Sequence, residues 1–183
     1  MLKSLHKRTQ VRRRTSARGF SLIELLIVVA IILIIAAIAI PNFLQAKISA
    51  NQAAAVESVR TITTASEVYS TTWGNGFPPS LAALGGLVPA TCNGAVLIDN
   101  LIASAPNAKS GYTFNYTPQG PPVTSPPAGC TAGYEADIVT AVPLSIYSGT
   151  DSYCADEPGV IHFNTLGTAI AGPAACDALP ALQ

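Results

Sequence analysis

Residues 20–40 are apolar except for Ser21 and Glu24, and Glu24 is the only charged residue among them. As an α-helix these 21 residues are about 31 Å long, which matches the hydrocarbon core of a bilayer. The chain after Pro41 is much more polar, and it contains no second apolar run long enough to cross. The pattern predicts one membrane segment near the N-terminus, with the bulk of the protein on the far side.

A helical pattern of a different kind follows Pro41. Apolar and small side chains recur three, four or seven positions apart, at Ile48, Ala55, Val59, Ile62, Ser66, Tyr69 and Trp73. Gly74-Asn75-Gly76 is typical of a helix end. We predict one long helix from about Leu22 to Trp73, whose second half packs this stripe on a globular head. Proline removes a backbone hydrogen bond, so we expect a kink at Pro41; the alternative is that the membrane helix ends there.

Shorter patterns in residues 75–183 are typical of a small α+β domain. Aromatic and polar side chains alternate over residues 111–117, which predicts a strand with Tyr112, Phe114 and Tyr116 on one face. Four prolines between residues 119 and 129 predict a surface loop instead of a strand.

Two further strand patterns follow this loop. Residues 134–142 predict a strand that Pro143 ends, and residues 152–155 and 160–163 flank a turn that predicts a hairpin. Short helices are expected before the first strand, and the small-residue tail is expected to be tethered by Cys176. The predicted fold class is α+β, with an antiparallel meander of three or four strands.

Charge is unevenly distributed along the chain, although the formal net charge is zero. Seven of the ten basic side chains precede Phe20, and all ten acidic side chains lie from Glu24 onward. Without residues 1–19 the chain is strongly acidic, so phosphate groups would repel it and no nucleic-acid partner is predicted. The basic block could be a binding arm, but beside a membrane segment it is more typical of the cytoplasmic flank that orients the helix.

Four cysteines lie in the part of the chain predicted to be exported: Cys92, Cys130, Cys154 and Cys176. They are dozens of residues apart and only His162 lies nearby, which does not resemble a zinc site. Two disulfides in an oxidising compartment are the better interpretation. Three pairings are open, and we favour Cys92–Cys130 with Cys154–Cys176 because these close two separate local loops.

The apolar run also has features of a cleavable secretory signal. Ala37-Ile38-Ala39 fits a signal-peptidase site, and cleavage there would release a soluble secreted protein. The run is longer than the usual apolar region of about 7–15 residues. A charge at mid-membrane costs roughly 2.5–3.5 kcal/mol, so a plain signal or anchor has no use for Glu24. An acid in such a segment suggests a functional partner.

The residues Gly19-Phe20-Ser21-Leu22-Ile23-Glu24 and the apolar residues after them resemble the start of type IV pilins and of type II secretion pseudopilins. The resemblance implies that a prepilin peptidase cuts between Gly19 and Phe20, removes the basic leader and N-methylates Phe20. It also implies that Glu24 is an assembly residue, which neutralises the terminal amine of an adjacent subunit in a filament.

The resemblance divides the chain into a leader, residues 1–19, the membrane and filament-core half of a spine helix, residues 20–40, its amphipathic half, residues 41–74, and a head, residues 75–183. It implies a pilin-like fold with a small antiparallel sheet on the spine. The implied partners are further copies of the chain, the prepilin peptidase and an assembly machine. The implied location is the bacterial inner membrane before assembly and a periplasmic or extracellular filament afterwards.

Two other functional hypotheses remain beside the pilus subunit. One is a pseudopilin of type II secretion, and the other, from a different class, is an exported binding or enzymatic domain that uses the helix only as an anchor. No catalytic set, phosphate loop or cofactor motif is apparent, so we expect a non-enzyme without cofactors. Asp151, Asp156 and Glu157 are weak calcium candidates without EF-hand spacing, and a solvated acidic turn is the preferred interpretation.

Overall fold

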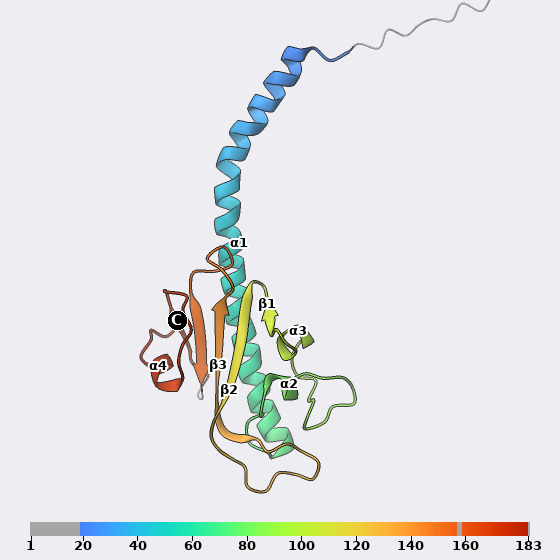
Figure 1. Ribbon diagram of the computed structural model, residues 1–183, viewed down its shortest axis with the longest axis vertical. Helices are drawn as coiled ribbons and strands as arrows, with labels where there is room; N and C mark the ends of the chain where they lie inside the picture. Colours follow the sequence, from blue (N-terminus) through green and yellow to red (C-terminus); the bar gives the residue numbers. More distant parts are fainter. Residues whose placement is uncertain (1–18, 157–158, 183) are drawn as a thin grey trace, which may run out of the picture. The chain divides into compact units, whose positions relative to one another are not determined.

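The structure is a computed structural model that describes residues 19–156 and 159–182. The predicted leader up to residue 18 lies outside the described residues, as does Glu157. The chain divides into two compact units, the first ending at Pro41 and the second beginning at Asn42. Helix α1, Leu22–Trp73, contributes residues to both (Figure 1).

Helix α1 has the bounds that the sequence predicts. It continues through Pro41, so the alternative that the helix ends there is wrong. It ends where Gly74 adopts a positive φ of 59°, a conformation that costs glycine little, and the Gly74 N–H donates to Ser70 O at 3.0 Å. The two units divide at Pro41, and the kink expected there stays a prediction.

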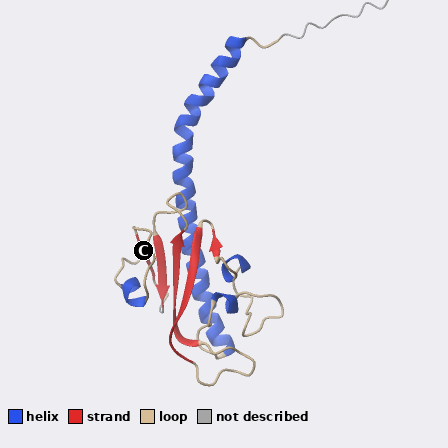
Figure 2. Cartoon of the chain, in the orientation of Figure 1, coloured by secondary structure: helices blue, strands red, loops and turns tan. Residues whose placement is uncertain are grey.

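The second unit contains a five-stranded antiparallel meander (Figure 2). Its strands, in both chain and spatial order, are β1 (Ala108–Lys109), β2 (Tyr112–Pro122), β3 (Tyr134–Pro143), β4 (Ser152–Asp156) and β5 (Ile161–Asn164). The predicted α+β fold and its meander are confirmed, with the short β1 as an additional edge strand. Three short helices complete the unit: α2 (Leu81–Leu84), α3 (Asn100–Ala103) and α4 (Pro173–Asp177).

The predicted loop at residues 119–129 is wrong over its first part, because β2 continues to Pro122. Strand β1 pairs with Tyr112 and Thr113, and Phe114 N donates to Asn107 O at 2.8 Å, so β2 has one edge without a partner strand beyond Phe114. Proline lacks an N–H group and is tolerated on such an edge, where no ladder hydrogen bond is lost. A register shift between Gln119 and Pro122 accommodates the irregular end of the strand.

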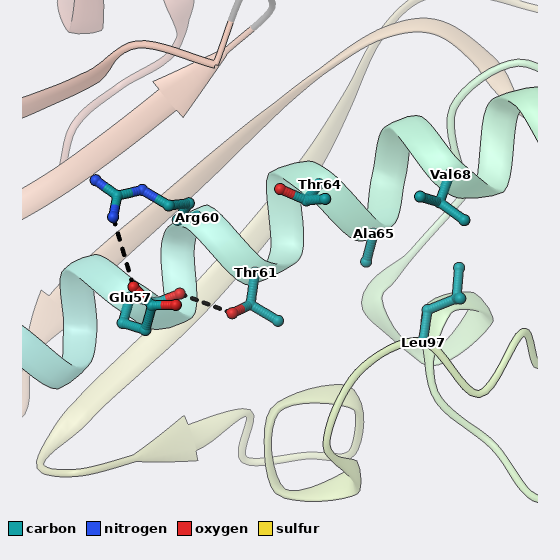
Figure 3. Close-up of a pocket in the computed structure, with 7 residues that line it drawn as sticks. All are labelled: Glu57, Arg60, Thr61, Thr64, Ala65, Val68 and Leu97. Atoms are coloured by element: carbon teal, nitrogen blue, oxygen red, sulfur yellow. Dashed lines mark hydrogen bonds and ion pairs between the residues drawn. The ribbon is translucent and has the colours of Figure 1, made fainter.

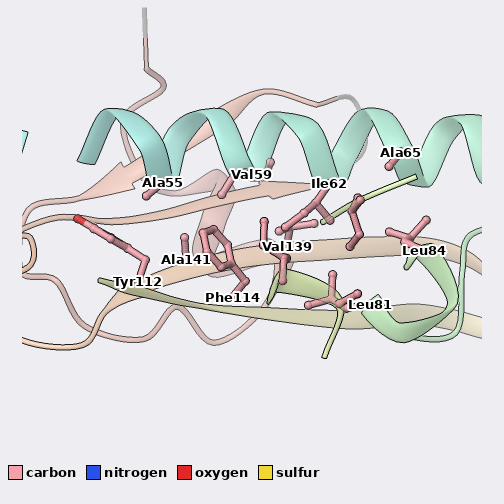
Figure 4. Close-up of a cluster of buried hydrophobic side chains, with 14 of the residues drawn as sticks. Ala55, Val59, Ile62, Ala65, Leu81, Leu84, Tyr112, Phe114, Val139 and Ala141 are labelled. Atoms are coloured by element: carbon pink, nitrogen blue, oxygen red, sulfur yellow. The ribbon is translucent and has the colours of Figure 1, made fainter. Parts of the chain in front are cut away.

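The core lies between one face of the sheet and the second half of α1 (Figure 4). The predicted stripe supplies Ala55, Val59 and Ile62, which face Phe114 and Val139 of the sheet. The alternating aromatic side chains of β2 lie on this face, with Tyr112 and Phe114 buried and Tyr116 packed at the margin, as predicted. The side chains that recur at helical spacing on α1 therefore pack against those that alternate on the strands, and together they form one apolar layer.

The opposite face of the sheet is covered in part by the C-terminal segment. Cys176 of α4 is bonded to Cys154 of β4, and Ile138 completes a small second cluster. Backbone hydrogen bonds also hold the segment along β5, including Leu182 N to Ile161 O at 2.7 Å. The predicted tether of the tail is confirmed.

Candidate functional site

The junction between Gly19 and Phe20 is open to solvent. Phe20 is 82% exposed, and a side chain added at Gly19 would meet no heavy atom within 4 Å. The fold of this chain therefore does not itself require a glycine at position 19, so any requirement for one comes from a partner that binds the segment.

Glu24 lies in the first turn of α1, where it caps the helix. The Ser21 backbone N–H donates to Glu24 Oε2 at 2.9 Å, and Leu25 N donates to Ser21 O. This is half of the reciprocal arrangement known as a capping box, and it satisfies one of the N–H groups that a helix start leaves free. Sequence reasoning missed the role of Ser21, although Ser-x-x-Glu before an apolar run is a known signature of it.

The apolar half of α1 is uncovered. Its large apolar side chains from Leu22 to Ile40 are between 47% and 80% exposed. By length and composition this is a helix able to cross a membrane, a test that core helices and signal sequences also pass, but here none of the apolar window is buried. Such a surface is unfavourable in water and needs a bilayer or other apolar helices against it.

Comparison with known proteins finds sequence similarity in the N-terminal part of the chain. The family described as the prokaryotic N-terminal methylation motif matches residues 14–40. The chain is 50% identical over 52 residues, 28% of its length, to the type IV major pilin protein PilA of Myxococcus xanthus, covering 24% of that protein. It is 64% identical over 36 residues, 20% of its length, to the type IV wide pilus major component PilA4 of Thermus thermophilus, covering 28% of that protein.

The N-terminal segment of the chain carries the prokaryotic N-terminal methylation motif and is similar to two type IV pilus components. The resemblance seen in the sequence is thereby confirmed for this segment, which contains Gly19, Phe20 and Glu24. The matches span about a quarter of the length of these pilin relatives. No solved structure matches the chain. The long apolar helix and the pilin motif together fit anchoring in a membrane.

The four cysteines of the second unit form two disulfides, Cys92–Cys130 and Cys154–Cys176. This is the pairing favoured from the spacing. The first bond ties the segment between α2 and α3 to the β2–β3 connection, and the second ties α4 to β4. His162, on β5, contacts Leu179 O through Nδ1 at 2.7 Å, so it too holds the C-terminal segment in place.

Two of the weak calcium candidates, Asp151 and Asp156, lie within the described residues. Asp151 lies immediately before β4 and Asp156 is its last residue, so five residues of extended chain, about 16 Å, separate them. Within residues 19–156 and 159–182, no group of three acidic, histidine or cysteine side chains is placed to hold a metal. Asp156 is instead buried beside Asp177, and burial, followed by the Asp177 charge, raises the pKa of Asp156.

A buried acid that sequence reasoning missed lies on the core face of β3. Asp137 accepts a hydrogen bond from Ser66 Oγ, and the Tyr116 hydroxyl lies 3.3 Å from the same Ser66 oxygen. Burial raises the pKa of Asp137, while the hydrogen bonds from Ser66 and Tyr116 oppose the shift. The alternation of β3 places residue 137 on the same face as Val139, but no local pattern reveals that an acid there has a partner on α1.

A shallow pocket of about 340 Å³ lies along the exposed side of α1 (Figure 3). Val68 and Leu97 line its apolar end, and Glu57 and Arg60 line its polar end with an exposed ion pair at 3.5 Å. Exposed ion pairs of this kind contribute about 0–1 kcal/mol. The pocket contains none of the sequence-predicted site residues, and its lining residues include no nucleophile paired with a base.

Proposed function

We propose that the protein is a structural subunit of a type IV pilus or pilus-like filament. It is made as a prepilin in the bacterial inner membrane, cut between Gly19 and Phe20, methylated at Phe20 and polymerised through α1. Its role is structural and not enzymatic. The partners are other copies of the chain, the prepilin peptidase and the assembly machine, and the final location is a filament outside the inner membrane.

The observation that carries this proposal is the uncovered apolar half of α1 with its one acid at Glu24. A bilayer satisfies the apolar side chains but not a carboxylate, whereas a bundle of such helices satisfies both. Cleavage before Phe20 would create a positive amine four residues from Glu24. In the bundle, Glu24 of one subunit can neutralise that amine on its neighbour.

The capping hydrogen bond describes how the Glu24 carboxylate is stabilised before the chain assembles into a filament. Before assembly, the Ser21 N–H partly compensates Glu24 within its own chain. Assembly then adds an ammonium group as a stronger, charged donor. Because an unpaired charge in an apolar core is expensive, the pairing favours one axial register between neighbouring helices.

Mass spectrometry of the mature chain is the first test. We expect a chain that begins at N-methylated Phe20. A chain that begins at Ile40 would show cleavage after Ala39 by signal peptidase and would contradict the filament proposal.

Three substitutions of Glu24 separate charge from helix capping. Glu24→Leu removes both, Glu24→Gln keeps an oxygen that can accept from Ser21 N–H, and Glu24→Asp keeps the charge. We expect normal membrane levels of all three, and at least a tenfold loss of sheared filaments for Leu and for Gln. Normal filaments from Glu24→Gln would assign Glu24 to capping alone, and normal function of Glu24→Leu without filaments would favour the simple membrane anchor.

The pilus and pseudopilin hypotheses differ in whether the filaments require a type II secretion system. The named relatives are pilus components, which favours the pilus. Long surface filaments should therefore persist in cells that lack a type II secretion system. Filaments that require that system would favour the pseudopilin.

A further inference from the structure

An uncharged apolar patch lies on the head, formed by the β3–β4 loop and the loop after β5. Ile146 is 72% exposed and Leu166 is 77% exposed, and both line one hollow of about 460 Å³. Leu144 and Tyr147 are also exposed in the first loop. We call these four residues the loop patch. Clusters of exposed apolar side chains of this kind mark interaction sites.

The loop patch is held rigidly. Ser148 N and Gly149 N both donate to Ser145 O, at 2.9 and 3.2 Å, and Leu144 N donates to Gly111 O at 2.9 Å. From α1, Asn51 Nδ2 donates to Ser148 O at 2.9 Å, and Gln52 Nε2 donates to Thr150 Oγ1 at 2.9 Å. The loop therefore presents its apolar side chains outward in a fixed conformation, which lowers the entropy cost of binding.

Close packing fixes the backbone of both loops. A Cβ added at Gly149 would lie 2.0 Å from the Tyr112 hydroxyl oxygen, and one added at Gly167, where φ is +62°, would lie 2.5 Å from Thr150 O. Tyr112 in turn donates to Asp151 O at 2.8 Å. The patch is thus built on the core of the head and is not a loose surface loop.

Charge indicates which partner fits the patch. Residues 143–150 and 165–172 carry no charged side chain, although the chain from Asn42 onward has nine acidic and three basic side chains. The acidic surfaces of two heads repel each other. An uncharged apolar element can approach the patch without this repulsion, and residues 25–40 of α1 form such an element on the same chain.

We propose that the loop patch binds the uncharged apolar part of α1, residues 25–40, of a second copy of this chain. The contact rests on the proposed filament function and names a head surface that takes part in it. It joins two different surfaces of identical chains, so it is heterologous and propagates as an open helical array instead of closing as a dimer. Ile146 and Leu166, which both line the hollow, receive apolar side chains of the neighbouring helix.

Charge substitutions in the full-length chain test the contact in cells that assemble it. Ile146→Glu and Leu166→Glu should each reduce sheared filaments at least tenfold, while membrane levels and N-terminal processing stay unchanged. Ile146→Leu should assemble normally. Leu87→Glu is the matched control, because Leu87 is 80% exposed on another loop of the head, and its yield should stay within twofold. Normal filaments from both patch variants would overturn the proposal.

A cross-link identifies the occupant directly. A photoreactive p-benzoylphenylalanine at position 146 of a tagged copy, co-assembled with an untagged copy, should give a dimer-sized product in filaments. Mass spectrometry should locate the link within residues 25–40 of the untagged chain. A link to lipid, to another protein or to a different part of the chain would overturn the proposal. If filaments form without this link, the patch proposal is wrong and the proposed filament function still stands. If the unchanged chain forms no filaments, both the patch proposal and the filament function are wrong.

Discussion

Single acids in this protein have different roles because their surroundings differ. Glu24 is exposed at a helix start and accepts one backbone hydrogen bond, whereas Asp137 is buried in the core with Ser66 and Tyr116 as partners. Asp156 is buried against a second acid, Asp177. Only the first of these is available to another chain, which is why the assembly proposal concerns Glu24 alone.

The buried carboxyl of Asp137 should make stability depend on pH. Its pKa is raised above the usual 3.8, so the folded state binds the proton more tightly than the unfolded chain does. The contribution of this group to the unfolding free energy is greatest below about pH 3.8 and falls as the pH rises through the folded-state pKa. Asp137→Asn keeps an acceptor for Ser66 and removes this dependence.

The stability of Asp137→Asn relative to the unchanged protein should therefore increase as the pH rises from about 4 to 8. Thermal unfolding of the detergent-solubilised chain measures it at each pH. Asp151→Asn, a carboxyl outside the core, is the control. Parallel curves for Asp137→Asn and the unchanged protein would contradict the predicted protonation of the folded state.

Asn75 is a second buried polar residue with a structural role. Its amide nitrogen donates to Thr131 O at 2.7 Å and to the Tyr69 hydroxyl at 3.2 Å, and its oxygen accepts from Gly133 N at 3.4 Å. Each buried group left unsatisfied costs roughly 1–3 kcal/mol, so Asn75→Ala should lower the unfolding free energy by about 3 kcal/mol.

Asn93→Ala is the matched control in urea unfolding of the same preparation. Asn93 also makes two hydrogen bonds to the backbone, with Gly129 O and Thr131 N, but it is exposed to water. Water can replace its partners, so we expect a loss within about 1 kcal/mol. Equal losses at the two positions would mean that burial of Asn75 is not what makes it stabilising.

At the scale of elements, helix α1 presents two faces in its second half. Val59 is fully buried against the sheet, whereas Val68 is 42% exposed beside the shallow pocket. Val59→Ala removes two buried carbon atoms and should cost about 2 kcal/mol. Val68→Ala should cost less than about 0.5 kcal/mol, since surface changes have small effects. Equilibrium unfolding in urea measures both, and a larger loss for Val68→Ala would reverse the assigned faces.

Strand β2 contains prolines in the half that has no partner strand on one side. Its first half is alternating and buried on one face, and its second half contains the prolines that usually end a strand. Pairing with β3 continues on one side while the other side stays unpaired. The prolines also protect the free edge against pairing with another chain, because they present no N–H group.

For the whole molecule, the two disulfides connect segments outside the sheet to each other, Cys92–Cys130, or to a strand, Cys154–Cys176. They link residues 38 and 22 positions apart and restrict the unfolded chain accordingly. By loop entropy each contributes about 3–4 kcal/mol. Replacing either pair with serines should lower stability by that amount, measured by thermal unfolding against the unchanged protein. A pair whose removal has no effect would show that its loop is already restricted by other contacts.

The sequence by itself determined the features that depend on neighbours along the chain. These are the N-terminal methylation motif, the bounds of α1, the buried stripe and the aromatic face of β2. A motif and the periods of a helix and a strand are local properties of the chain. Four cysteines allow three pairings, and local loop closure favoured the one that the structure contains.

Tertiary structure alone decided which distant residues meet. The pairing of Ser66 with Asp137, and the anchoring of Ser148 by Asn51, join positions 71 and 97 residues apart. It also decided that β2 continues through its prolines, since edge position is a property of the sheet and not of the strand. Such contacts follow from the packing of α1 on the sheet, and no periodic pattern along the chain encodes them.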